Sequence, residues 1–78
     1  MEQQKIFVDF HNSDRNGRVR LNTDGTFRDL DKYGIVLQTG LELYLDDMEG
    51  NSIDCIVEFS PEENIWVGVF NTEKLKNP

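Results

Sequence analysis

Cys55 and His11 are the only cysteine and the only histidine of the chain, so a thiol nucleophile would have to use His11 as its base. Cys55 lies within a run that alternates apolar and polar residues, on the apolar side, where a thiol usually acts as a small hydrophobic residue. One Cys and one His cannot supply an ordinary zinc ligand set. The single cysteine is typical of a reducing compartment, and we expect a cytoplasmic protein.

The segment Asn12–Gly17 has the second spacing that could do chemistry. Asn12, Asp14 and Asn16 place side-chain oxygens at alternate positions before Gly17, as in the first half of a calcium-binding loop. The position that should hold a bidentate glutamate is Thr23, so we interpret the segment as a solvated turn. Phosphate-binding glycine motifs are absent from the sequence. We therefore predict no metal site, no cofactor and no enzymatic activity.

Charge is distributed unequally along the chain. Residues 1–35 contain six acidic and six basic residues, whereas residues 36–78 contain nine acidic residues and two lysines. The net charge of -7 therefore arises entirely in the second half. Such asymmetry has two interpretations: it can mark a surface for a partner, or the two halves can neutralise each other inside one fold.

All four arginines occur between residues 15 and 28, and they could form a basic edge that binds nucleic acid. The run Gly17-Arg18-Val19-Arg20-Leu21, followed by Gly40-Leu41-x-Leu43-x-Leu45, resembles the core of AbrB-type swapped-hairpin transcription regulators. The resemblance covers about thirty residues and implies a DNA-binding role. A nucleic-acid-binding regulator is accordingly the alternative function, and its candidate residues are Arg15, Arg18, Arg20 and Arg28.

The elements that would position these residues are mostly strands. The hydrophobic residues include no alanine and are rich in Val, Ile, Leu and Phe, which favours strands over helices. Apolar and polar residues alternate over residues 5–10, 18–21, 41–46, 53–59 and 65–70. A short helical turn is predicted at residues 26–33, where Thr26 and Asp29 have capping-box spacing and Gly34 can end the helix. A last helical turn is expected at residues 71–75.

Seventy-eight residues allow one small domain, which we place at residues 1–78. No apolar run is long enough to cross a membrane, and we expect no secretory signal segment. The sequence thus predicts an all-β protein: a small SH3-like barrel or roll of about five antiparallel strands with one short helical turn. Edge strands in so small a sheet leave both a monomer and a homodimer open.

The alternation over the last three predicted strands gives two faces, of which the apolar one should form the core. Its members are Leu41, Leu43, Leu45, Ile53, Cys55, Val57, Phe59, Ile65, Val67 and Val69. The other face mixes aromatic and acidic residues, with Gly68 leaving a slot beside two of the rings. Such a face could bind a protein with a basic surface. We therefore predict a non-catalytic protein–protein interaction module or small subunit that binds its partner through Tyr44, Trp66, Phe70, Glu42, Asp46 and Glu58. The competing interpretation is that Arg18, Arg20 and the helical turn cover this face, making Trp66 and Phe70 a second, smaller core.

Overall fold

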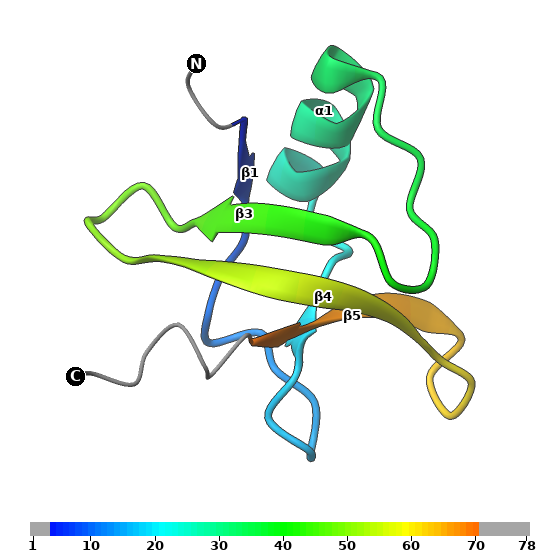
Figure 1. Cartoon of the computed structure of the whole chain (residues 1–78). Helices are drawn as coiled ribbons and strands as arrows, with labels where there is room; N and C mark the ends of the chain where they lie inside the picture. Colours follow the sequence, from blue (N-terminus) through cyan, green and yellow to red (C-terminus); the bar gives the residue numbers. More distant parts are fainter. Residues whose placement is uncertain (1–3, 71–78) are drawn as a thin grey trace, which may run out of the picture.

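The computed structural model describes residues 4–70, which form a mainly β domain with one helix. The helical turn predicted for residues 71–75 lies outside the described residues. Five strands form one strongly bent half-barrel sheet in the order β1-β3-β4-β5-β2, and Figure 1 shows how it curves. The elements are β1 (Lys5–Phe7), β2 (Val19–Arg20), α1 (Asp24–Tyr33), β3 (Glu42–Asp46), β4 (Ser52–Ser60) and β5 (Ile65–Phe70).

The sheet is mixed, which corrects the prediction of an entirely antiparallel one. Strands β3, β4 and β5 form an antiparallel meander with β2 antiparallel to β5, but β1 runs parallel to β3. A parallel pair needs a long crossover connection, and the segment between β1 and β3 provides it by way of β2 and α1. The alternation of residues 5–10 indicates a strand but contains no information about its partner.

Helix α1 is longer than the short helical turn predicted at residues 26–33 and begins at Asp24 instead of Thr26. The reason is that Thr23 is the N-cap: its Oγ1 accepts a hydrogen bond of 3.1 Å from the backbone N–H of Thr26. The predicted C-terminal cap is confirmed, because Gly34 has φ 66° and its N–H bonds the carbonyls of Asp31 and Leu30.

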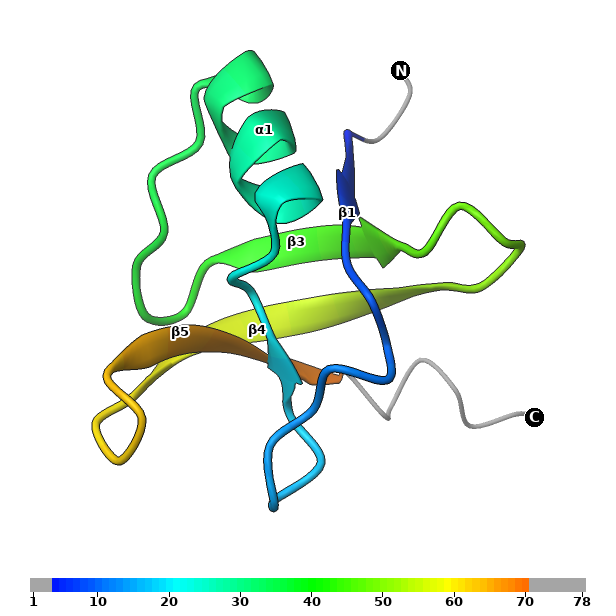
Figure 2. The ribbon, with the colours of Figure 1, turned by 180° about the vertical axis from the view of Figure 1, so that it is seen from behind.

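Helix α1 also covers the outer edge of β1, as Figures 1 and 2 show from opposite sides. The backbone N–H of Phe7 donates to Oδ2 of Asp29 at 2.9 Å, and the Thr26 hydroxyl donates to the carbonyl of Phe7 at 2.6 Å. The Phe7 ring lies against Gly25, where an added Cβ would come within 2.6 Å of Phe7 Cδ2. Helix and strand are therefore joined by side chain–backbone hydrogen bonds and by close packing.

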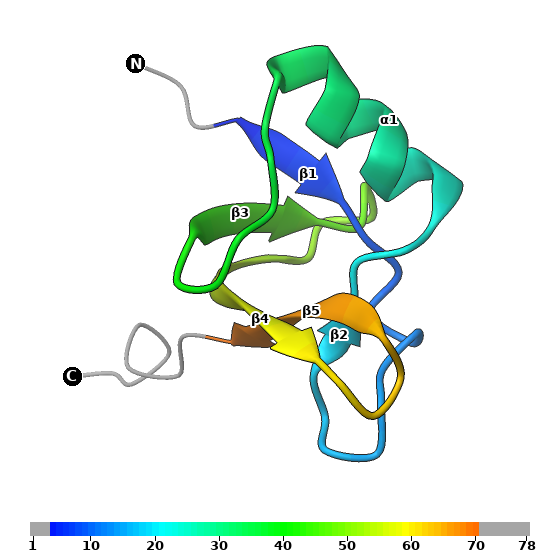
Figure 3. The same cartoon turned by 90° about the vertical axis from the view of Figure 1, so that its right-hand side faces the viewer.

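The other edge of the sheet is covered by the loop that precedes β2. The N–H of Arg20 donates to the carbonyl of Asn12, and the N–H of Asp14 donates to the carbonyl of Arg18, both at 2.8 Å. This loop, residues 8–18, and helix α1 lie at opposite ends of the molecule in Figures 1 and 3.

The core lies on the concave side of the sheet and contains most of the predicted apolar residues of β3 and β4, namely Leu43, Leu45, Ile53, Cys55 and Val57. The prediction is wrong for Phe59 near the end of β4, which is 39% exposed. For β5 the predicted face is wrong, because the observed register pairs Val57 with Gly68 and Phe59 with Trp66, although Val67 is fully buried on the other side. Paired residues face the same side of a sheet, so the core side of β5 is the one with Trp66, Gly68 and Phe70. Every residue of this strand is apolar or glycine, so its own pattern cannot choose a face. The fully buried hydrophobic residues, each at most 1% exposed, are Ile6, Val8, Val19, Leu21, Leu45, Cys55, Val57 and Val67.

Candidate functional site

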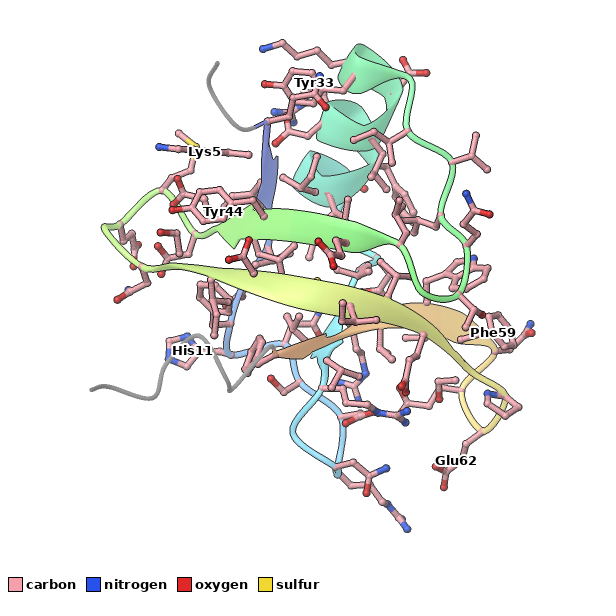
Figure 4. The ribbon with its side chains drawn as sticks, viewed as in Figure 1. Lys5, His11, Tyr33, Tyr44, Phe59 and Glu62 are labelled. Carbon is pink, nitrogen blue, oxygen red and sulfur yellow. The ribbon has the colours of Figure 1, made fainter. Side chains whose placement is uncertain are left out.

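The six residues predicted to bind a partner do not share a face. Glu42, Tyr44, Asp46 and Glu58 lie on the outer side of the sheet, whereas Trp66 and Phe70 point to the core side. Trp66 packs edge-on against Phe59 with ring centroids 5.1 Å apart, and Phe70 packs edge-on against Phe10 at 5.9 Å. In Figure 4, Tyr44 and Phe59 lie at opposite ends of the β3–β4 pair. Gly68 leaves no open slot, because Cys55 Sγ would lie 2.9 Å from an added Cβ.

The two aromatic residues instead join the main core, which corrects the idea of a second core beneath the arginines. What lies on the outer side at that point is Val67, which is 0% exposed and whose register neighbours are Arg20 and Glu58. Arg20 forms a two-pronged pair with Glu63 at 2.8 and 3.0 Å, and Arg18 Nη1 lies 3.5 Å from Glu58. Arg20 and Glu58 thus flank Val67 on the outer side of the sheet.

The same contacts neutralise most of the predicted basic edge. Arg15 lies 3.9 Å from Glu62, and Arg18 and Arg20 have the acidic partners just described. The carboxylates come from the second half of the chain, so the two halves do neutralise each other at this end. The Arg20 side chain lowers the pKa of Glu63, and Glu63 raises that of Arg20. Arg28 lies apart on α1 and makes no ion pair within the described residues.

Asp14, the central acid of the calcium-like segment, is used by its own loop. Its carboxylate is 3% exposed and accepts 2.9 Å hydrogen bonds from the N–H groups of Asn16 and Arg18 and from Arg18 Nε. Burial alone would raise the pKa of Asp14, but these hydrogen bonds and the Arg18 charge outweigh it and lower the pKa. Both carboxylate oxygens hold the loop together, as expected for a turn.

Cys55 and His11 are not brought together. Cys55 is fully buried, and burial raises the pKa of its thiol to about 12. The His11 side chain is 99% exposed on the loop after β1, as Figure 4 shows. A neutral, enclosed thiol without a neighbouring base has no means of activation.

Aromatic and acidic residues come together at the open mouth of the half-barrel. A groove of about 400 Å³ has Phe10, Ile53 and Phe70 among its lining residues, together with Asp47 and Glu49 of the β3–β4 turn. We call this the mouth groove; His11, Asn51 and Ser52 complete its lining. Its aromatic residues are the edge-on pair described above, and both rings are only partly buried.

The β3–β4 turn holds the acidic rim in place. Asp47 accepts hydrogen bonds from the N–H groups of Glu49 and Asn51 and from the Asn51 side chain, at 2.8 to 3.1 Å. The bond from the Asn51 side chain is the main cause of a lowered pKa at Asp47, so this carboxylate remains charged near neutral pH. The N–H of Met48 donates to Asp46 Oδ1, and Met48 adopts φ 65°. The rim is thus a pre-ordered, negatively charged turn.

Sequence reasoning identified Phe70 as a site residue but not the other residues of the mouth groove. The alternation of residues indicates only that Phe10 and Ile53 are inward-facing strand residues. Asp47 and Glu49 lie between two predicted strands, which indicates only a turn. Their meeting depends on the β1–β3 pairing, which brings the segment after β1 alongside the turn after β3. The sequence feature that could have indicated the groove is Phe10, an aromatic residue at the end of the alternating run of residues 5–10 and next to a polar segment.

No family model, curated protein or solved structure matches this chain. The two runs that carry the resemblance to AbrB-type regulators lie around β2 and β3, which are separated in the sheet by β4 and β5. Within residues 4–70 there is no helix with the length and apolar character needed to cross a membrane.

Proposed function

We propose that this protein is a non-catalytic interaction module, and that its mouth groove binds a basic, partly apolar peptide segment of another protein. The observation that carries the proposal is the partly exposed Phe10–Phe70 pair, placed beside the hydrogen-bonded carboxylate of Asp47 and the exposed carboxylate of Glu49. The aromatic rings offer apolar area to aliphatic side chains, and the acidic rim attracts Lys or Arg. The cytoplasm remains the expected compartment.

The alternative, a nucleic-acid-binding regulator, has less support. Arg15, Arg18 and Arg20 each lie within 4 Å of a carboxylate, so phosphate binding would first have to break these pairs. The SH3-like architecture expected from the sequence also remains a prediction. The strong bending of the sheet favours it, whereas the parallel β1–β3 pair departs from it.

The test is an NMR titration of the ¹⁵N-labelled protein with the acetylated hexapeptide Lys-Leu-Lys-Leu-Lys-Leu. Binding is monitored through the backbone amide chemical shifts. We expect shifts at Phe10, Ile53, Phe70 and Glu49, and none with the peptide Glu-Leu-Glu-Leu-Glu-Leu. Replacing the rim residue, Glu49→Lys, should weaken binding about tenfold, which is ~1.4 kcal/mol.

Glu62→Lys is the matched control, because Glu62 is an exposed glutamate in the β4–β5 turn, away from the groove (Figure 4). It should leave binding of the basic hexapeptide within about twofold of the wild type. An equal loss in both variants would mean that only overall charge attracts the peptide. Either that result or shifts confined to the outer side of the sheet would contradict the proposal.

A further inference from the structure

The mouth groove is one end of a longer depression. A cavity of about 350 Å³ adjoins it and shares Phe10, His11, Asp47 and Glu49. Phe7 connects this cavity to a third one, of about 400 Å³, lined also by Gly25, Arg28 and Met48. A fourth, of about 320 Å³, extends past Lys5 toward Lys32 and Tyr33. We call the four together the trough: it follows residues 5–11, with α1 at one end and the β3–β4 turn along its side.

The α1 end of the trough has an excess of available positive charge. Arg28 and Lys32 are one helical turn apart on α1, and both line the trough. Neither forms an ion pair with a described residue, although Lys32 Nζ lies 5.3 Å from the centre of the Tyr33 ring. The carboxylate of Asp29, between them, already accepts the N–H of Phe7.

The remaining acid at this end, Asp46, is also engaged. It accepts the N–H of Met48 and lies 3.7 Å from Lys5 Nζ. The hydrogen bonds leave the carboxylates of Asp29 and Asp46 charged, so the lining of the α1 end carries Lys5, Arg28 and Lys32 against these two acids, a net charge of +1. The opposite, mouth end carries Asp9, Asp47 and Glu49 and has no lysine or arginine in its lining, a net charge of -3. The trough is therefore electrically polar: weakly positive beside α1 and negative at the half-barrel mouth.

Between the two charged ends the trough is apolar. Phe7 lines three of the four cavities, and Met48 lines two of them. Met48 is 78% exposed and sits in the left-handed region at φ 65°, fixed there by its hydrogen bond to Asp46. A large exposed apolar side chain in a conformation that favours glycine is a feature that a docking surface explains.

We infer that the partner segment is an extended peptide with opposite charges at its two ends. Its acidic end binds Arg28 and Lys32 beside α1, its apolar middle packs on Phe7 and Met48, and its basic end enters the mouth groove. Residues 5–11 end in a turn at Phe10 and His11, so the trough is shorter than the roughly 23 Å of a fully extended seven-residue run, and a ligand of about seven residues is the upper limit. The inference rests on the proposed function, because it uses the same mouth groove, and adds the chemistry and placement of the acidic end.

The probes are two heptapeptides, Glu-Leu-Glu-Leu-Lys-Leu-Lys and its reverse, together with the basic hexapeptide used above. We expect at least one heptapeptide to bind more tightly than the hexapeptide. The double variant Arg28→Glu/Lys32→Glu should weaken that heptapeptide at least tenfold, which is ~1.4 kcal/mol, and should not weaken the hexapeptide. Arg15→Glu, which reverses an exposed arginine at the far loop, is the matched control and should weaken neither peptide more than about twofold.

A nitroxide attached to the acidic end of the bound heptapeptide gives the placement directly. It should broaden the amide signals of α1 and spare those of Ile53 and Phe70, whereas a label on the basic end should do the reverse. Circular dichroism of the double variant is the check that it folds.

The outcomes separate the two levels of the proposal. If the hexapeptide binds but the heptapeptide is insensitive to Arg28→Glu/Lys32→Glu, the inference is wrong and the proposed function remains. If neither peptide binds, the proposed function itself is wrong. Sedimentation equilibrium adds a third result: a dimer disrupted by the same double variant would mean that a second copy occupies the trough, and the inference would be overturned.

Discussion

At the scale of single residues, Gly68 decides which side of β5 faces the core. An added Cβ there would lie 2.9 Å from Cys55 Sγ and 3.3 Å from Val19 Cγ1. Three neighbouring strands meet at this point, so only a residue without a side chain fits. The flanking residues Trp66 and Phe70 then necessarily share that side.

Gly68→Ala should therefore destabilise the domain by about 1–3 kcal/mol through overpacking. Cys55→Ala removes the closest opposing atom, so adding it to Gly68→Ala should recover about 1 kcal/mol relative to the sum of the single effects. Urea unfolding of the two single variants and the double variant measures this coupling. Strict additivity would show that Cys55 Sγ does not limit the space at residue 68.

The limits of sequence reasoning can be seen in the same strand. Strands β3 and β4 carry acidic residues on one side only, and their predicted core faces are confirmed for Leu43, Leu45, Cys55 and Val57. Strand β5 has no charged residue, so both faces were equally compatible with its sequence. The predicted face places Trp66 and Phe70 on the outer side of the sheet, so the sequence does not predict that Phe70 lies beside Phe10 in the mouth groove. Only the close packing around Gly68, a property of three strands together, distinguishes the alternatives.

At the scale of elements, α1 protects the edge of β1. The side chains of Thr26 and Asp29 satisfy the carbonyl and the N–H of Phe7 that point away from β3. An unsatisfied strand edge would invite pairing with another chain, so these two side chains also disfavour association through β1. The sequence predicted the helix from its caps but not this role, because residues 7 and 26 are brought together only by the fold.

Thr26→Val should destabilise the domain by about 1–2 kcal/mol, because it leaves the buried side of the Phe7 carbonyl without a donor while preserving side-chain shape. Thr26→Ser keeps the hydroxyl and should cost less. Thermal unfolding of the two variants provides the comparison. A larger loss for Thr26→Ser would mean that the methyl group of Thr26, which is 0% exposed, matters more than its hydrogen bond.

The loop before β2 is held by Asp14 in a comparable way, and this gives a pH dependence. Because the pKa of Asp14 is lowered from 3.8 in the folded protein, its contribution is fully present above about pH 5. It is lost as the pH falls through 3.8 toward the folded pKa, since the unfolded chain binds the proton more readily. Asp14→Asn should thus be about 1–2 kcal/mol less stable than the wild type at pH 7.

That difference should shrink below pH 3.8 as Asp14 itself becomes protonated. Urea unfolding at pH 7, 5 and 3 measures the gap. A gap of constant size would indicate that Asp14 acts only as a neutral hydrogen-bond acceptor. Asn at this position can still accept the two backbone hydrogen bonds through Oδ1, but its Nδ2 would face the Arg18 Nε donor. The gap at pH 7 therefore contains the loss of both the charge and the Arg18 side-chain hydrogen bond.

At the scale of the whole molecule, the net charge of -7 is resolved differently at the two ends. Glu58, Glu62 and Glu63 lie within 4 Å of arginines from the first half. The mouth groove and the cavity that adjoins it, which contain Asp47 and Glu49 of the β3–β4 turn, have no arginine among their lining residues. The unequal charge along the sequence predicted that one of two situations would hold, and the fold contains both: neutralisation around β2 and a negative field at the mouth.

This field should make binding of the basic hexapeptide depend on salt. At ionic strengths well above 0.1 M the screening length falls below about 10 Å, so attraction between the mouth carboxylates and the lysines should weaken progressively. The loss should be mainly in the association rate, because exposed charges steer the encounter more than they hold the complex.

Glu49→Gln should flatten the salt dependence, whereas Glu62→Gln should leave it unchanged, since Glu62 faces Arg15 at the other end. Stopped-flow fluorescence with a dye-labelled peptide between 20 and 500 mM NaCl (roughly 20 to 4 Å screening length) separates the rates. Equal slopes for both variants would place the steering charge outside the mouth groove.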